Sequence, residues 1–252
     1  MEHTIGARIC GVITATVLLF GASVLPTQAV EPPSADADFS ELLALNPGTT
    51  EAEMFDVIRT ISAETGMNEQ EVIAQGLEEG RRSVAAASHP ATSSEGDTAR
   101  PGRMRAYMLP RAQRPGDIFV APASTLFVHH GHTGIYYTIG AVVEAPGAGK
   151  LSRAVARRQV PVESGTEIMA VNVSAASAKT AGDYAKNNLV GKPYSTQFVA
   201  NKNTTAAKMN CSQLVWSAYK ASVSVDLDGD GGLGVYPNDI KKSPRTSTYL
   251  TL

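Results

Sequence analysis

Hydrophobic residues in the C-terminal part of the chain, residues 103–252, recur in short runs bounded by turn residues. These runs predict strands at 117–121, 133–139, 142–145, 160–162 and 167–173. Two longer stretches place apolar residues on one helical face and predict helices at 175–189 and 211–221. Gly191 and Pro193 end the first of these helices. Strands and helices within one segment predict an α+β domain.

In residues 30–86, by contrast, apolar residues recur every three to four positions, which is typical of helices. Thr50 and Glu53 have the spacing of a capping box, and apolar residues follow at helical steps: Met54, Val57, Ile58 and Ile61. Asn68 or a neighbour can cap a second helix, whose apolar face holds Val72, Ile73 and Leu77. Two short amphipathic helices bury little apolar surface alone, so we expect this segment to need a partner surface.

Between these parts, residues 87–102 are rich in Ser, Thr, Pro and Gly, which predicts a flexible linker. The net charge of −2 hides an asymmetry: residues 30–102 hold 14 Asp or Glu and 4 Lys or Arg, whereas residues 103–252 hold 9 and 17. Opposite charges favour an intramolecular contact between the acidic 30–86 segment and the basic domain. A pro-segment or inhibitory helical pair is one interpretation; a solvated spacer and a helical module for another partner are the alternatives.

The N-terminus has the features of a secretory signal peptide, residues 1–29. Arg8 precedes an uncharged run over residues 9–25, and Thr27-Gln28-Ala29 resembles a small-x-small cleavage site. An uncleaved signal anchor is the alternative, because the run is long for a signal core, although it is short for a membrane span. Cleavage predicts a secreted, extracytoplasmic protein with no stable membrane span.

Composition narrows the class of protein. Hydrophobic residues make up 43% of the chain and charged residues 18%, which fits a globular protein with an ordinary core. Two cysteines close at most one bridge, which excludes a disulfide-stapled miniprotein. Removal of residues 1–29 would also remove Cys10 and leave Cys211 alone. A lone cysteine in a secreted protein is either an unreactive buried residue or a thiol kept for chemistry.

Cys211 lies in the first turn of a predicted helix that Asn210 can cap. At this position the helix dipole and the free N–H groups favour the thiolate, and the following N–H groups can donate to an oxyanion. A cysteine nucleophile works best at such a place. The alternative is a buried cysteine that packs like an alanine.

Three histidines, His129, His130 and His132, lie close together and raise the question of a metal site. We find no fourth ligand at a typical spacing and no second cysteine in the mature chain, so we expect neither metal nor cofactor. His132 begins a predicted strand, which would hold it rigidly as a general base for Cys211, and Gly134 leaves room beside it. We interpret His129 and His130 as loop residues.

Glu144 is the candidate partner that orients His132. A general base needs a third group that fixes its tautomer. Glu144 lies on the next predicted strand, in the otherwise apolar stretch 142–145. A carboxylate is rarely buried in such a stretch unless it has a partner. The alternative is an edge residue that faces water.

Three motifs in one order resemble the NlpC-type papain-like hydrolases: residues 114–118 (RPGDI), 131–136 (GHTGIY) and 143–145 (VEA). In the standard arrangement of that family the cysteine helix precedes these strands, whereas residues 210–219 (NCSQLVWSAY) follow them here. This order resembles the circularly permuted branch, the YiiX/YebB-like group, which is related in permutation to the lecithin:retinol acyltransferases. Residues 191–194 (GKPY) are similar to a GxxY segment ahead of the cysteine helix in this group.

The resemblance covers little more than half of the chain and implies a circularly permuted papain-like (NlpC-type) fold with an antiparallel sheet and a cysteine-bearing helix. It implies Cys211 as nucleophile, His132 as base and Glu144 as the orienting residue of a thiol hydrolase or acyltransferase. Thr133 departs from the commoner Val after the histidine. The acidic segment 30–102 has no counterpart in the pattern.

The substrates implied are peptidoglycan peptides, by the standard relatives, and lipid amides or acyl acceptors, by the permuted branch. A basic domain outside the cell suits such anionic cell-envelope substrates, and we expect no nucleic-acid partner. Two rival functions remain. One is a non-catalytic envelope-binding module with a structural Cys211, and the other is a protein–protein module that binds through the acidic helices.

Residues 226–231 (DLDGDG) match the start of an EF-hand calcium loop. Pro237 stands where the bidentate glutamate should be, and no flanking helix pair is evident. We therefore interpret these residues as a polar turn that precedes residues 235–237.

Overall fold

The computed structural model describes residues 35–88, 107–122 and 130–252. The predicted signal peptide, residues 1–29, lies outside the described residues, as does most of the predicted linker. Within the described ranges, every helix is too short or too polar to cross a membrane.

The N-terminal described part, hereafter the helical segment, consists of α1 (Ala35–Ala44), α2 (Glu51–Thr65) and α3 (Glu69–Ser88). The predicted capping box is confirmed, because the backbone N–H of Thr50 donates to Glu53 and the backbone N–H of Glu53 donates to Oγ1 of Thr50. Asn68 and Glu71 form the same pair of bonds at the start of α3. The sequence pattern missed α1, and α3 runs two residues into the segment predicted as linker.

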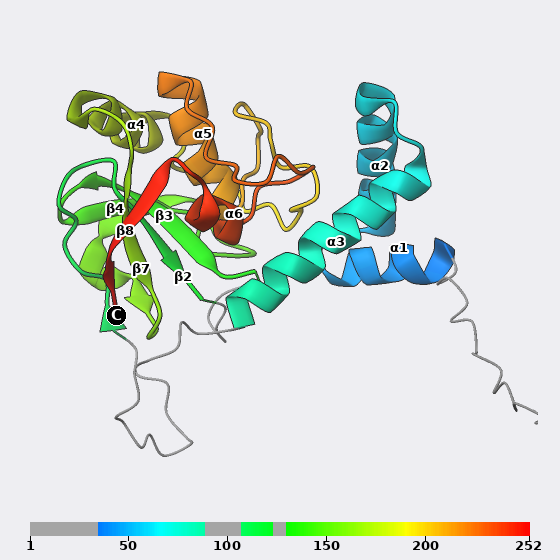
Figure 1. The fold of residues 1–252 in the computed structure, drawn as a ribbon, viewed down its shortest axis with the longest axis horizontal. Coiled ribbons are helices and arrows are strands. Elements are labelled where there is room, and N and C mark those ends of the chain that lie inside the picture. Colours follow the sequence, from blue (N-terminus) through cyan, green and yellow to red (C-terminus); the bar gives the residue numbers. More distant parts are fainter. Residues whose placement is uncertain (1–34, 89–106, 123–129) are drawn as a thin grey trace, which may run out of the picture. The chain divides into compact units, whose positions relative to one another are not determined.

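The remaining described residues, hereafter the sheet domain, contain a six-stranded antiparallel sheet in the order β5-β4-β3-β2-β7-β8 (Figure 1). Its strands are β2 (Ile118–Ala121), β3 (His132–Thr138), β4 (Ala141–Glu144), β5 (Arg153–Ala156), β7 (Glu167–Val171) and β8 (Thr246–Thr251). A separate antiparallel pair joins β1 (Tyr107–Met108) to β6 (Pro161–Val162), and a 3-10 turn, η1 (Arg157–Gln159), precedes β6. Four predicted strands are therefore confirmed in β2, β3, β4 and β7, whereas the predicted 160–162 strand belongs to the small pair.

Helices α4 (Ala175–Asn188) and α5 (Cys211–Val223) lie together against one face of the sheet (Figure 1). Their small and apolar residues pack on alternate strand residues in one buried cluster, which includes Ile118, Ile135, Val143, Ala181, Leu214 and Val215. The other face carries a second cluster, which includes Leu109, Phe119, Tyr136, Val142 and Ile168. A short helix, α6 (Pro237–Lys242), follows α5. The prediction of a mixed α+β fold with an antiparallel sheet and a cysteine-bearing helix is confirmed.

The helical segment has its own apolar cluster, to which the sheet domain contributes. Buried residues of α1, α2 and α3 surround Val199 of the sheet domain, and Leu233 packs against the same cluster. The cluster holds Leu42, Met54, Ile58, Ile61, Val72, Ile73 and Leu77. The apolar faces of these helices are thus covered in part by their own chain.

Candidate active site

Cys211 is the first residue of α5, as the sequence predicts, and its side chain is fully buried. Asn210 caps the helix, because its Oδ1 accepts the N–H of Gln213 at 2.8 Å. Asn210 is itself held by a bond from its Nδ2 to the carbonyl oxygen of Gln197 at 2.9 Å. The first N–H groups of a helix have no acceptor within the helix, so this end of α5 can stabilise negative charge beside the thiol.

His132 and Glu144 meet through the register of two neighbouring strands. His132 is the first residue of β3, and Glu144, the last residue of β4, pairs with Gly134. Residues two apart on a strand share a face, so the imidazole and the carboxylate project to the same side. Nε2 of His132 lies 2.7 Å from Oε2 of Glu144, and the two side chains are 2% and 1% exposed. Glu144 is therefore buried and does not face water.

The thiol of Cys211 is the second partner of this imidazole. Burial alone would lower the pKa of His132, but hydrogen bonds with Cys211 and Glu144, together with the charges of both groups, raise it from 6.5 to about 9. With Nε2 directed at Glu144, the other ring nitrogen, Nδ1, is left for the thiol. The sulfur and the carboxylate on its two sides thus favour the protonated form of the imidazole.

Arg153 is a fourth member of the site, which the sequence analysis missed. It pairs with Glu144 across β4 and β5, and its Nε and Nη2 donate to Oε1 of Glu144 at 2.9 and 2.6 Å. Burial alone would raise the pKa of Glu144, but the hydrogen bonds and charges of His132 and Arg153 lower it. The carboxylate is thus held ionised, with one oxygen for each partner. The signal was hidden because the sequence pattern did not predict β5.

The space beside His132 is filled by an aromatic ring. The sequence analysis expected Gly134 to leave room, but Phe119 pairs with Gly134, and a Cβ added at Gly134 would lie 2.6 Å from the Phe119 ring. The ring of Phe119 packs at 5.5 Å, centroid to centroid, from that of His132. Gly134 therefore admits Phe119, which fixes one side of the imidazole and keeps water from it.

Tyr194, the last residue of the GKPY segment, lies next to the thiol. The sequence analysis assigned it no role. Burial and the nearby Cys211 raise the pKa of Tyr194 well above its usual value. A parallel bridge joins Tyr194 to Met209, two residues before Cys211, and Met209 also donates its N–H to the carbonyl oxygen of Pro193 at 3.0 Å. The buried hydroxyl makes no well-aligned hydrogen bond within the described ranges, although it adjoins the sulfur. It is positioned to donate to a group that arrives at the thiol.

A cleft of about 450 Å³ lies beside Tyr194. The helical segment contributes Glu53 and Asp56 of α2 to its lining, and the sheet domain contributes Lys208. The other polar residues that line it are Thr49, Ser195, Thr196 and Gln197. The helical segment thus forms part of the surroundings of Tyr194.

His130 lies in a different environment from His132. His130 is 1% exposed, and its Nε2 lies 2.9 Å from the carbonyl oxygen of Leu45 in the helical segment. Its ring packs at 4.7 Å from that of Phe198 and at 5.1 Å from that of Tyr236. His130 lies in a turn, as predicted, but it is buried there. His129 lies outside the described residues.

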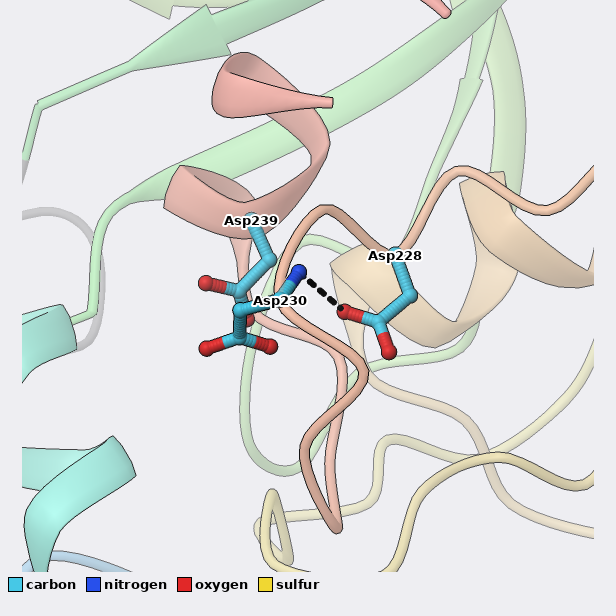
Figure 2. Close-up of side chains that lie close together, drawn as sticks. All are labelled: Asp228, Asp230 and Asp239. Atoms are coloured by element: carbon cyan, nitrogen blue, oxygen red, sulfur yellow. Dashed lines mark hydrogen bonds between the residues drawn. The ribbon is translucent and has the colours of Figure 1, made fainter. Parts of the chain in front are cut away.

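Three aspartates gather at the segment that resembles a calcium loop (Figure 2). One carboxylate oxygen from each of Asp228, Asp230 and Asp239 lies within 4.8 Å of the others. The figure shows Asp239 on α6 and the other two on the preceding loop, where the N–H of Asp230 donates to Oδ1 of Asp228. Lys202 forms an ion pair with Asp228, and Arg82 forms one with Asp230 at 3.3 Å. The chain itself therefore offsets two of the three charges.

No family model matches the sequence. YycO of Bacillus subtilis strain 168, an uncharacterized protein, is 33% identical to this chain over 248 residues, which cover 97% of this chain and 98% of YycO. The chain belongs to the YycO family. Because the alignment spans nearly the whole chain, the likeness to YycO includes the helical segment, for which the motif resemblance offered no counterpart. A crystal structure of the metalloprotein YiiX from Escherichia coli O157:H7 superposes with a TM-score of 0.43 at 18% identity, over 57% of this chain and 98% of YiiX.

In this member of the YycO family, the three residues that the sequence singled out lie together. His132 contacts both Cys211 and Glu144. The tertiary structure adds Arg153 behind Glu144 and Tyr194 beside the thiol. The arrangement can hold a thiolate next to an imidazolium and can supply hydrogen-bond donors to an oxygen that gains negative charge.

Proposed function

We propose that this YycO-family protein is a secreted cysteine hydrolase that acts on an amide or ester carbonyl of a cell-envelope substrate. The observation that carries the proposal is the buried imidazole of His132 between Glu144 and the thiol of Cys211, at a helix N-terminus. Acyl transfer through a thiol requires a nucleophile, a base and an orienting carboxylate that contact one another. The likeness of the motifs to the circularly permuted NlpC-type papain-like hydrolases supports the same reaction and fold.

In the proposed acylation step, the proton of Cys211 resides on His132. The thiolate attacks the carbonyl carbon, a carbon–sulfur bond forms, and the carbonyl electrons move to the oxygen. That oxyanion accepts hydrogen bonds from the N–H groups of the first turn of α5 and from the hydroxyl of Tyr194. When the intermediate collapses, the amine or alcohol leaves with the proton from His132, and an acyl-thioester remains on Cys211.

In the proposed deacylation step, water attacks the thioester while His132 accepts its proton. The carboxylic acid leaves, the thiolate is regenerated, and the imidazolium is restored. Glu144 keeps Nδ1 directed at the sulfur in both steps because it engages Nε2. An amine or alcohol in place of water would make the same site an acyltransferase.

The cleft beside Tyr194 supports a polar substrate, such as a peptidoglycan peptide, over a lipid amide. Acyl chains bind in pockets lined by apolar side chains, whereas this cleft offers charged, hydroxyl and amide groups beside its apolar surface. Release of soluble peptides from purified cell walls would support this choice. Turnover of acyl amides or esters with no release from cell walls would favour the lipid instead.

The second candidate function is a non-catalytic envelope-binding module with a structural Cys211. The full burial of Cys211 favours it, because an unreactive packing role needs no access to solvent. In that case the thiol would react slowly with iodoacetamide at every pH, and His132 would have no effect on it.

The test compares the pH dependence of alkylation by iodoacetamide in the wild type and in His132→Ala, with peptide mass mapping to separate Cys211 from Cys10. We expect fast alkylation of Cys211 at pH 6 in the wild type and its loss in His132→Ala. Slow alkylation at pH 6 in both proteins would contradict the hydrolase and leave the binding module.

A further inference from the structure

The helical segment reaches the sheet domain through a buried carboxylate. Glu79 of α3 is 3% exposed. Its Oε1 accepts the N–H of Leu233 at 2.7 Å, and its Oε2 accepts the N–H of Gly234 at 3.0 Å. Gln75, one turn earlier on α3, donates to Oε1 at 2.9 Å. A buried carboxylate is tolerated only where donors replace water, so this contact fixes the loop that holds residues 233 and 234.

The loop is shaped to receive α3. A Cβ at Gly232 would lie 2.4 Å from Oε1 of Glu79, and a Cβ at Gly234 would lie 2.1 Å from the carbonyl oxygen of Phe198. Only glycine lets the backbone come this close to a helix on one side and to a loop on the other. Residues 231–234 (GGLG), of which only Gly231 belongs to the predicted polar turn, therefore include the place where the helical segment docks.

From this loop, buried hydrogen bonds lead to the first turn of α5. Val235 donates its N–H to Oδ1 of Asn201 at 2.7 Å, and its carbonyl oxygen accepts from Nδ2 of Asn201 at 2.8 Å. The same carbonyl accepts the hydroxyl of Ser212 at 2.7 Å. Nδ2 of Asn201 also lies 3.3 Å from Oδ1 of Asn210, the cap of α5. A displacement of the 233–235 backbone would therefore move the groups that hold the nucleophile.

A second contact supports the same region. Oδ1 of Asn46, which is 1% exposed, accepts the N–H of Phe198 at 2.8 Å. The carbonyl oxygen of Leu45 lies 2.9 Å from Nε2 of His130, two residues before His132. The helical segment thus touches the chain beside the candidate base as well as the loops beside the nucleophile.

One ion pair in this contact runs against the net charges of the two parts. The ion pair Arg82–Asp230 places the basic side chain on the acidic segment and the acidic one on the basic domain. Buried hydrogen bonds and the apolar cluster around Val199 are further parts of the contact. Salt screens buried bonds much less than exposed ones, so the contact is suited to a permanent arrangement.

We infer that the helical segment is a permanent working part of the protein and that Glu79 is a positioning residue for the nucleophile helix. The inference rests on the proposed function, because the position of Cys211 matters only if the thiol reacts. It differs from the pro-segment interpretation, in which removal of residues 30–102 releases activity. Removal would instead leave the N–H groups of Leu233 and Gly234 without their acceptor and would uncover Val199.

The experiment uses the full-length chain and the variant Glu79→Gln, which keeps the size of the side chain but turns an amide N–H₂ toward a backbone donor. Glu78→Gln is the matched control, because Glu78 is the adjacent residue on α3 and its side chain is 72% exposed. Gly232→Ala disturbs the same contact from the loop side and serves if Glu79→Gln does not fold. Two quantities are measured: the rate of Cys211 alkylation at pH 6 and at pH 8.5, and hydrogen exchange of the peptide that contains residues 211–215.

We expect Glu79→Gln and Gly232→Ala to slow alkylation at pH 6 about tenfold, the effect of losing one hydrogen bond to a charged group. At pH 8.5 the change should be smaller, because hydroxide can then take the place of the imidazole as the base. Exchange in residues 211–215 should become faster, and Glu78→Gln should match the wild type in both measurements. A purely structural role would reduce the yield of folded protein but leave the pH profile of the folded fraction unchanged.

Unchanged alkylation and unchanged exchange in folded Glu79→Gln and Gly232→Ala would overturn the inference while the proposed function stands. Slow alkylation at pH 6 in the wild type itself would overturn the proposed function instead. Exchange then decides the structural part of the inference: faster exchange in the variants supports the positioning contact, and unchanged exchange refutes it.

Discussion

Arg153 lies directly opposite Glu144 across β4 and β5, and its guanidinium donates two hydrogen bonds to one carboxylate oxygen while His132 engages the other. A line of three side chains thus crosses three adjacent strands, from β3 to β5. Only the outer member is accessible to solvent, since the side chain of Arg153 is 44% exposed and that of Glu144 is 1% exposed. The orientation of the candidate base therefore depends on a residue at the edge of the sheet.

Arg153→Met should make His132 a weaker general base, although the imidazole itself is still present. Loss of the guanidinium leaves Oε1 of Glu144 buried without its donors, so the carboxylate should hold the imidazolium of His132 less well. We expect alkylation of Cys211 at pH 6 to slow about tenfold, as for the loss of a hydrogen bond to a charged group. Arg158→Met is the control, because Arg158 is an exposed arginine on η1. Equal rates in the two variants would show that Arg153 does not act on the base.

Tyr194→Phe should slow ester hydrolysis much more than alkylation, although both reactions use the thiol of Cys211. Alkylation forms no oxyanion, so its rate should stay within about twofold of the wild type, whereas hydrolysis of p-nitrophenyl acetate should fall about 10²-fold if the hydroxyl donates to the oxyanion. Tyr184→Phe on α4, which removes a hydroxyl from a half-buried tyrosine, is the control. A parallel loss in alkylation and hydrolysis would assign Tyr194 to packing around the thiol.

The protonation of His132 links stability to pH. Its pKa rises from 6.5 to about 9 on folding, so the folded state binds the proton more tightly than the unfolded state. The stabilisation is fully present below pH 6.5 and is lost as the pH rises through about 9. The imidazole of His132, followed by NMR, should therefore keep its proton at pH 7.5 and lose it only as the pH approaches about 9. Loss of this proton with a midpoint near 6.5 would contradict the raised pKa.

Leu77→Ala tests whether the helical segment and the sheet domain share a core. Leu77 is 2% exposed in the cluster that includes Val199. The substitution should lower the free energy of unfolding by about 2–5 kcal/mol, as expected for a buried leucine. Leu151→Ala is the control, because Leu151 is 56% exposed and should cost less than about 1 kcal/mol. Intact, wild-type-like stability would show that the segment is loosely attached.

The local pattern of hydrophobic and polar residues was sufficient to predict the strands and the helix that carry the candidate site residues. The run around residues 117–121, the strand that starts near His132 and the helix capped by Asn210 were all predicted close to their observed bounds. Each is a local property, because strand alternation, helix period and caps depend on neighbours within a few residues. The same holds for the capping boxes at Thr50 and Asn68.

The residues that support the site were beyond such reasoning. Arg153 acquires its role from its register opposite Glu144, and Tyr194 from a bridge to Met209. In the sequence, nothing distinguishes Glu79 from the other acidic residues of its helix. In the structure, it is buried against a loop more than 150 residues away in the chain. The burial of His130, the ring of Phe119 over Gly134 and the docking role of residues 231–234 are further cases.

The sequence by itself thus determined the helix and strands that carry the candidate site, the sign of the charge on each part, and the cysteine, histidine and glutamate of that site. Which side chains lie behind and beside them was decided only by the tertiary structure. The physical reason is that strand register and loop docking are set by burial over the whole fold, and neither leaves a period in the sequence.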